Sequence, residues 1–458
     1  MPFKFTVVTD KSLTSKNVLI LITAFCILFF KIFVNWGDAD HPFIMDVNQY
    51  YGYLPALFKQ HDLTFTPNPN SIWLTPTPIG KGVPLVTYGM SLFYLPFYLI
   101  ASIFSSSNST GYEPIYAWSV HIGCIIYVLI GLYYCRKTLL IWFSEKVTSL
   151  TLFVIFFGTT LFCYTLINSE LTHSILFFLI SMFVHYVVKW HQSGQLNYFF
   201  WFSFLLGLIT LIRPTEISIV IFPLLIGVTS YKAFKEKLFI ILNMKYFLIV
   251  GIILFFIPIF PQLLYWKIQS GQWLFFSYGS KERFFWLQPQ FINVLFSYRK
   301  GWLVYSPLML LSLLGFIILF KKNKPLFLGI IIYFLINLYL ISSWWDWAYG
   351  GAFGMRALVQ VSAILIIPLA YFIQCFFEVV KLNYLKFAGA VVVLFFCFLN
   401  VLQSNLYKHG IISYDGMTKE SYWFTFLKKN YSKEDLLYLE TLVKHPDYSA
   451  MRQGKRDD

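Results

Sequence analysis

Long apolar segments, separated by short polar loops, follow one another along most of the chain. Segments 246–265 and 387–402, for example, contain no charged residue. Many of these segments are close to the ~20 residues that an α-helix needs to cross the hydrocarbon core of a membrane. Few of them alternate apolar and polar residues as the strands of a membrane barrel do. The pattern therefore predicts an all-α polytopic membrane protein.

We expect about eleven transmembrane helices, from segment length, loop charge and aromatic residues at the segment ends. The predicted spans are 18–36, 115–135, 148–167, 173–190, 197–212, 217–231, 246–265, 303–320, 325–343, 357–378 and 386–406. Residues 1–17 form a polar N-terminus, and the apolar segment after them lacks a cleavage site of small residues. The first span is therefore expected to remain uncleaved.

Basic residues predict the orientation. Lys and Arg gather in four short loops that fall on the N-terminal side of this topology, within 136–146, 232–245, 321–324 and 381–386. Cytoplasmic loops carry an excess of Lys and Arg, so this side is predicted to be cytoplasmic. The N-terminus then lies in the cytoplasm.

Two segments on the outer face, 37–114 and 266–302, are too long to be simple connectors, and such loops often carry function. The apolar stretch Val83–Phe104 is either a further span or an interfacial helix. We interpret it as interfacial, because a span there would place Arg136 and Lys137 outside. Residues 18–406 then form the membrane domain, and residues 407–458 an outer-face soluble tail with one or two helices around Glu434–Val443.

Composition excludes an ordinary soluble enzyme. The chain has 58% hydrophobic and 12% charged residues, whereas soluble domains carry roughly 25% charge. Its net charge is +14, but Lys and Arg are scattered over the loops, which argues against a nucleic-acid partner. The six cysteines form no C-x-x-C pair, so neither a metal site nor a disulfide framework is indicated.

The first outer segment contains a candidate catalytic carboxylate. Asp46 precedes the tyrosine-rich stretch of Tyr50 and Tyr51, where a short helix is expected to begin. A carboxylate there is alternatively only a helix cap or a partner of the helix dipole. Asp38 and Asp40 have D-x-D spacing, which suits a divalent cation. Two acidic residues after a span more often stay in water, and we expect no metal cofactor.

Further candidates lie in outer turns. Lys81, in a Gly/Pro-rich turn, is placed either to meet a lipid phosphate or to anchor the chain at the interface. Glu170 and His173 are three residues apart and share one face if their turn is helical. Arg213 either pairs with Glu216 in its own turn or binds a ligand.

The last candidates surround the entry to two later spans. Arg299 and Lys300 stand directly before one of them. The loop 343–356 carries three Trp around an Asp, then a Gly-rich turn and Arg356. Such Trp and Tyr residues usually form an aromatic belt at the interface. An aromatic belt does not require the acidic residue, the glycines and the arginine that this loop also contains, so we expect the loop to contact a ligand.

All of these candidates fall on the outer face under one topology, although their loops are far apart in sequence. Ionisable groups held at the membrane boundary are costly and tend to be functional. Guanidinium groups bind phosphate bidentately, and flat aromatic faces suit sugar rings. The pattern predicts a ligand that has a phosphate, a sugar and a lipid tail.

The chain resembles the GT-C superfamily of multi-spanning glycosyltransferases, nearest to the bacterial protein O-mannosyltransferase and aminoarabinose-transferase-like members. The resemblance covers most of residues 18–404. Its motifs are 46–51, 81–96, 170–173, 213–215, 299–301 and 344–356. The chain departs from the O-mannosyltransferases, which commonly have an Asp-Glu pair, because Asp46 is followed by Val47. The sugar and the acceptor are therefore not carried over.

The resemblance implies a hexosyl- or pentosyltransferase of a bacterial cytoplasmic (inner) membrane, with its active site on the outer, periplasmic face. It implies a polyprenyl-phosphate sugar donor, a glycan, lipid or protein acceptor, contact with membrane lipids, and Asp46 as the base of an inverting displacement. The residues expected to bind the donor phosphate are Lys81, Arg213, Arg299, Lys300 and Arg356. Those expected to bind substrate are Tyr50, Tyr51, Glu170, His173, Trp345, Asp346 and Tyr349. The alternative is a transporter or flippase of lipid-linked sugars, which often shows internal repeats; none is visible here.

Overall fold

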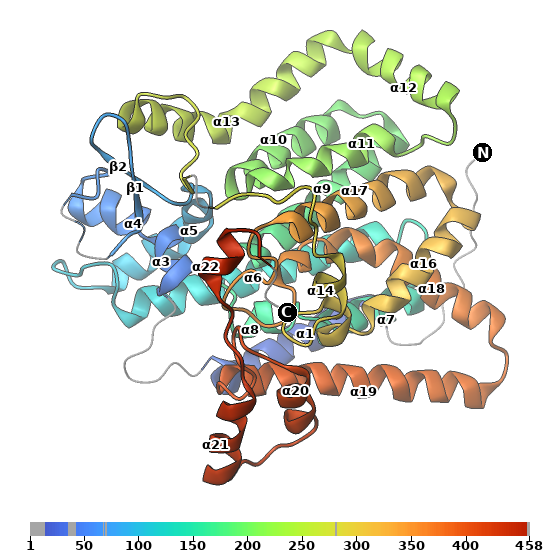
Figure 1. Cartoon of the computed structure of the whole chain (residues 1–458). Coiled ribbons are helices and arrows are strands. Elements are labelled where there is room, and N and C mark those ends of the chain that lie inside the picture. The colour runs from blue at the N-terminus through green and yellow to red at the C-terminus, as the bar shows by residue number, and fades with distance from the viewer. Residues whose placement is uncertain (1–13, 35–42, 67, 69–70, 280–281, 456–458) are drawn as a thin grey trace.

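The computed structural model describes residues 14–34, 43–66, 68, 71–279 and 282–455, and the regular secondary structure of this part is almost entirely helical (Figure 1). Its longer helices are α1 (Ser15–Leu28), α5 (Gly89–Phe104), α6 (Pro114–Leu139), α7 (Glu145–Phe157), α9 (Thr172–Ser193), α10 (Leu196–Ile212), α12 (Tyr231–Asn243), α13 (Lys245–Ser270), α16 (Met309–Lys322), α17 (Lys324–Ser343), α18 (Ser362–Val379) and α19 (Asn383–Lys408). The shorter elements are α2 (Phe30–Phe33), α3 (Met45–Tyr51), α4 (Tyr53–Pro55), η1 (Ala56–Gln60), α8 (Cys163–Leu166), η2 (Pro214–Val220), α11 (Ile221–Leu225), α14 (Phe291–Phe296), α15 (Trp302–Tyr305), η3 (Arg356–Leu358), α20 (Lys419–Thr425), α21 (Lys433–Leu442) and α22 (Tyr448–Arg452). The strands β1 (Leu74–Pro76) and β2 (Gly82–Pro84) form one antiparallel hairpin.

The all-α, multi-pass prediction is confirmed. Helical segments lie at each of the predicted spans. Within the described residues, six helices are long and apolar enough to cross a membrane: α6, α9, α13, α17, α18 and α19. The other predicted spans are covered by shorter helices, so the total of about eleven stays a prediction. α13 and α19 leave most of their apolar side chains outside the bundle, as lipid-facing helices do.

The predicted span 148–167 is not one continuous helix, because α7 ends at Phe157 and α8 begins six residues later, at Cys163. The break frees backbone carbonyls of Phe157 and Thr159. The side-chain amide of Asn400 on α19 donates hydrogen bonds to both, at 3.0 and 2.7 Å. A non-helical segment is tolerated at membrane depth where protein satisfies its backbone. The apolar pattern runs through this break and gave no sign of it.

The predicted span 217–231 also differs. It consists of the 3₁₀ helix η2 followed by the short helix α11, which ends at Leu225. Pro214 opens η2 and Pro223 lies within α11, and proline lacks the N–H that a continuous α-helix needs. A 3₁₀ helix rises ~2.0 Å per residue, compared with ~1.5 Å for an α-helix, so η2 extends further along its axis than an α-helix with the same number of residues.

The stretch Val83–Phe104 holds strand β2 and the helix α5. α5 packs along α6 and buries one face through Tyr94 and Tyr98. The segment before it is fixed to the membrane helices, because Tyr88 donates to the carbonyl of Pro258 on α13 at 2.6 Å and Thr87 to that of Leu211 on α10 at 2.5 Å. The first outer segment is thus held firmly against the helix ends.

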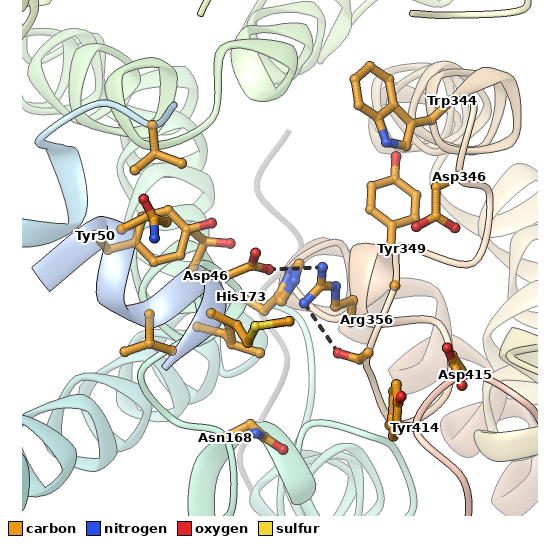
Figure 2. A pocket seen from close by; sticks show the side chains of 18 of the residues that line it. Asp46, Tyr50, Asn168, His173, Trp344, Asp346, Tyr349, Arg356, Tyr414 and Asp415 are labelled. Carbon is orange, nitrogen blue, oxygen red and sulfur yellow. Dashed lines mark hydrogen bonds and ion pairs between the residues drawn. The ribbon is translucent and has the colours of Figure 1, made fainter. Parts of the chain in front are cut away.

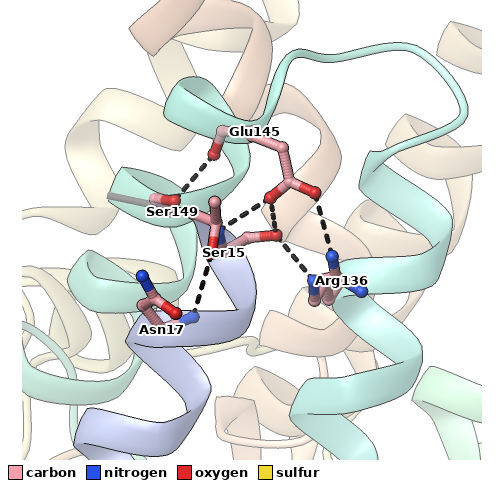
Figure 3. A network of polar contacts seen from close by, with 6 residues as sticks. Ser15, Asn17, Arg136, Glu145 and Ser149 are labelled. Atoms are coloured by element: carbon pink, nitrogen blue, oxygen red, sulfur yellow. Dashed lines mark hydrogen bonds and ion pairs between the residues drawn. The ribbon is translucent and has the colours of Figure 1, made fainter. Parts of the chain in front are cut away.

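The basic loops gather at one end of the bundle. There, Glu145 at the start of α7 pairs with Arg136 near the end of α6 at 2.9 Å and also accepts from Ser15, the first residue of α1 (Figure 3). Lys322 at the end of α16 pairs with Glu378 near the end of α18. These contacts support a common side for the loops that the sequence predicts to be cytoplasmic.

Candidate functional site

A large cavity lies at the opposite end of the bundle. Its volume is about 1870 Å³. The wall includes residues at the start of α9 and at the ends of α10, α17 and α19, together with parts of both long outer segments. The sequence predicted that loops distant in the chain would meet on one face, and these loops do meet around one cavity.

Asp46 and Arg356 both line this cavity and form an ion pair. Arg356 Nη2 lies 3.0 Å from Asp46 Oδ2, and Figure 2 shows them reaching toward one another from separate elements. Asp46 sits in the first turn of α3, and 36% of its side chain is exposed. Burial disfavours the charge on Arg356, but the Asp46 carboxylate, together with Tyr164, Tyr50 and Asp346, outweighs it, so the pKa of Arg356 is raised. The site thus holds a fixed ion pair with an accessible carboxylate.

Arg213 is a second cation in the cavity wall. Its guanidinium lies over the ring of Tyr349, 5.2 Å from the centroid. The alternative that it pairs with Glu216 is wrong, because the carboxylate of Glu216 instead accepts from Gln360 at 2.7 Å and from Tyr333 at 3.1 Å. Among the described residues Arg213 has no ion-pair partner. An unpaired guanidinium held over an aromatic face is suited to an anionic ligand.

The turn that carries Tyr349 is shaped by Asp346. Tyr349 and Gly350 both have positive φ, at 59° and 61°, a conformation that is uncommon for a tyrosine. The backbone N–H of Tyr349 donates to the backbone carbonyl of Asp346 at 3.0 Å and closes this turn. Burial raises the pKa of Asp346, and the charge of Arg356 acts against this. Trp345, Asp346 and Tyr349 all line the cavity, and their contact with a substrate stays a prediction.

Three more predicted residues line the cavity: Tyr50, Glu170 and His173. Burial, with the nearby charge of Asp46, raises the pKa of Tyr50 and keeps its phenol neutral. The carboxylate of Glu170 is engaged by His121 on α6. His173 bonds to Gln360 at 2.9 Å. Of these side chains, Tyr50 lies on the same short helix as Asp46.

Four predicted residues are not in the cavity wall. Lys81 is exposed at the tip of the β1–β2 hairpin. Tyr51 is fully buried, with its ring stacked on Phe43 and its hydroxyl bonded to the carbonyl of Gly111. Arg299 is buried with its guanidinium 5.9 Å from the Trp347 ring. Lys300 is also buried, and none of these four side chains lines the cavity that contains Asp46.

Lys300 connects two segments that form part of the cavity wall. Its ammonium donates to the carbonyls of Ala352 and Tyr414, and so joins the Gly-rich turn to the segment that follows α19. Both of these segments contribute to the cavity wall. Burial lowers the pKa of Lys300 to about 7.

We expect this burial to make stability depend on pH. The unfolded lysine has a pKa of 10.5, so between about 7 and 10.5 the unfolded chain binds more protons and the wild-type protein becomes more stable as pH rises. Lys300→Met is expected to be less stable, because two carbonyls lose their donor, and its melting temperature should lack this rise. Thermal unfolding in detergent from pH 6 to 10 measures both effects, with the exposed Lys81→Met as control. A Lys300→Met protein that keeps the full rise contradicts the assignment.

The C-terminal segment contributes to the site, which the sequence did not predict. Residues 407–415 and side chains of α21 and α22 line the cavity. Arg452 pairs with Glu282 at 3.5 Å and lies 4.6 Å from the Trp345 ring centroid. Asp415 accepts from Tyr448 at 3.0 Å. The tail sequence has no motif that signals this contact, so only the fold reveals it.

Glu282 is a further carboxyl in the cavity that the sequence did not single out. Burial raises its pKa, although Arg452 acts against this. Within the described residues no group of three or more His, Cys, Asp or Glu side chains is placed to hold a metal ion. Asp38 and Asp40 lie outside the described residues, and the expectation of no metal cofactor stays a prediction.

No family model and no curated protein matches the chain. Among solved structures, the crystal structure of ArnT from Cupriavidus metallidurans bound to undecaprenyl phosphate is similar, with a TM-score of 0.46 and 11% sequence identity. The match covers 79% of this chain and 60% of the ArnT chain, so this chain spans less than two thirds of that protein. Similarity of this size does not assign a family.

Proposed function

We propose that the protein is an integral-membrane glycosyltransferase of the GT-C type. It transfers a sugar from a polyprenyl-phosphate donor to an acceptor on the outer, periplasmic face of a bacterial inner membrane. One observation supports this most strongly: the accessible carboxylate of Asp46 shares a cavity with two guanidinium groups, and one of these, Arg213, has no ion-pair partner among the described residues.

The cations suit the donor phosphate. Arginine binds phosphate oxygens through parallel N–H donors, and Arg213 and Arg356 line the same cavity. One Nη atom of Arg356 contacts Asp46, and the guanidinium has further N–H donors that can bind a ligand. Apolar side chains such as Phe33 and Ile341 also line this space, and they suit the first isoprene units of a lipid carrier.

The carboxylate suits the acceptor. Asp46 takes the proton from the acceptor hydroxyl as its oxygen attacks the anomeric carbon. The bond from that carbon to the phosphate oxygen breaks on the opposite face, and its electron pair stays with the polyprenyl phosphate. The two guanidinium groups stabilise this leaving anion, so no general acid is required. A single displacement of this kind inverts the anomeric configuration.

A transfer assay tests the proposal. The purified protein is reconstituted into liposomes with a panel of polyprenyl-phosphate hexoses and pentoses, labelled in the sugar, and an acceptor fraction from a bacterial cell envelope. We expect the label to leave the lipid, bare polyprenyl phosphate to accumulate, and EDTA to leave the rate unchanged. Label that stays on the lipid and only changes leaflets would contradict transfer and indicate a flippase.

A further inference from the structure

A line of buried hydrogen bonds joins two residues of the cavity wall, His173 and Glu216, through Gln360, which lies behind the wall. Gln360, between η3 and α18, donates from Nε2 to Glu216 Oε1 at 2.7 Å. Its Oε1 lies 2.9 Å from Nδ1 of His173 at the start of α9. The three side chains are at most 4% exposed. Tyr333 donates to the other carboxylate oxygen of Glu216 at 3.1 Å, so the carboxylate is held from two sides.

The chemistry of these groups fixes the direction of each bond. The amide of Gln360 turns its NH₂ toward Glu216, because Nε2 is the atom that donates to the carboxyl oxygen. The amide oxygen then faces His173 and can only accept. The proton between Gln360 and His173 therefore belongs to Nδ1 of the imidazole.

The remaining nitrogen of His173 faces the ligand space. His173 lines the cavity, and no described residue bonds to its Nε2. Its ring is held edge-on against Tyr164, with centroids 5.5 Å apart. A buried imidazole that shares a cavity with Arg213 and Arg356 is favoured in its neutral form. With the proton on Nδ1, Nε2 of this neutral ring is a hydrogen-bond acceptor.

We propose that Nε2 of His173 accepts a hydrogen bond from a hydroxyl of the donor sugar, and that Gln360 and Glu216 are positioning residues that hold the imidazole in this tautomer. This inference rests on the proposed function. A lone pair repels phosphate oxygens, so the phosphate goes to the guanidinium groups and the acceptor nitrogen takes a group that donates. Next to the phosphate, the sugar ring offers its hydroxyls near the anomeric carbon. His173 therefore recognises the sugar, whereas the arginines recognise the phosphate.

Nuclear magnetic resonance of histidine labelled with nitrogen-15 tests the tautomer without any activity. The chain has eight histidines, and the His173 signals are those that disappear in His173→Gln. At neutral pH we expect a protonated Nδ1 and an unprotonated Nε2. In Gln360→Met the two tautomers should mix, because Nδ1–H loses its acceptor. A proton on Nε2 in the wild-type protein overturns the inference.

Kinetics and binding test the role. Gln360→Met is expected to lower kcat/KM for the lipid-linked sugar about ten- to a hundredfold, although His173 is still present. Its affinity for a bare short-chain polyprenyl phosphate should be unchanged, since that probe lacks the sugar. Gln403→Met is the matched control, because Gln403 is a buried glutamine that bonds to Tyr422 at 3.1 Å outside the cavity wall.

The outcomes separate the two proposals. Equal kcat/KM values for Gln360→Met and Gln403→Met, in a protein that does transfer sugar, overturn the inference alone. A wild-type protein that consumes no lipid-linked sugar overturns the proposed function and the sugar contact together, whatever the tautomer. Loss of affinity for bare polyprenyl phosphate in Gln360→Met assigns the line of hydrogen bonds to the phosphate and also overturns the inference.

Discussion

Asp46→Asn is expected to lower the rate of sugar transfer by about a hundred- to ten-thousandfold, the range that a positioned base contributes. The amide has nearly the shape of the carboxylate but does not take a proton from the acceptor hydroxyl. Asp46 is also the ion-pair partner of Arg356, at 3.0 Å. Loss of that charge frees the guanidinium, so binding of polyprenyl phosphate should persist or become tighter while the chemical step fails.

The matched control is Asp62→Asn. Asp62 also lies in the first outer segment, but its carboxylate bonds to Thr64 and it is not part of the cavity wall. We expect Asp62→Asn to transfer sugar at the wild-type rate. An Asp46→Asn protein that is folded, binds the donor and turns over as fast as Asp62→Asn would remove Asp46 from the mechanism, and Glu282 would become the next candidate base.

The double variant Arg213→Ala, Arg356→Ala is expected to lose most of its affinity for polyprenyl phosphate. A hydrogen bond to a charged group contributes about 1.5–3 kcal/mol, so each arginine should account for about a ten- to a hundredfold change in the dissociation constant. The two effects need not add, because both groups contact one ligand. Arg356→Ala alone also leaves the Asp46 carboxylate without its partner, and this should weaken binding of the anion further.

Binding of a fluorescent short-chain polyprenyl phosphate in detergent measures these effects. Arg283→Ala is the control, because this arginine lies on the same outer face but outside the cavity wall, with its guanidinium 5.0 Å from the Phe285 ring. We expect it to bind like the wild-type protein. If Arg283→Ala weakened binding as much as Arg213→Ala, the effect would come from the general positive charge of the face.

The sequence predicted the helical class, the common end of the basic loops and much of the cavity wall. Each of these follows from a local pattern, such as an apolar run or a charged turn. Arg299 and Lys300 show where local patterns fail. Both stand directly before a helix, as a phosphate clamp would, yet the ammonium of Lys300 turns inward to the carbonyls of Ala352 and Tyr414. The direction of a side chain in a loop depends on segments that are distant in the sequence.

The break between α7 and α8 has a similar cause. The residues around it are apolar except for Gly158 and the two threonines that follow it, and among them only Gly158 favours the end of a helix. A Cβ on Gly158 would lie 2.5 Å from Leu308 Cδ1, so glycine permits a close approach there. The freed carbonyls are satisfied by Asn400, more than 200 residues later. Likewise, the line of bonds through Gln360 is not visible in the sequence, because its members lie in three separate segments.

A structure of the protein with a bound polyprenyl phosphate tests the central claim most directly. We predict that the phosphate lies within hydrogen-bonding distance of Arg213 and Arg356, with the Asp46 carboxylate facing the position of the anomeric carbon and the lipid tail leaving between the helix ends. A phosphate bound elsewhere, for example at the exposed Lys81 on the hairpin turn, with the cavity empty, would contradict it.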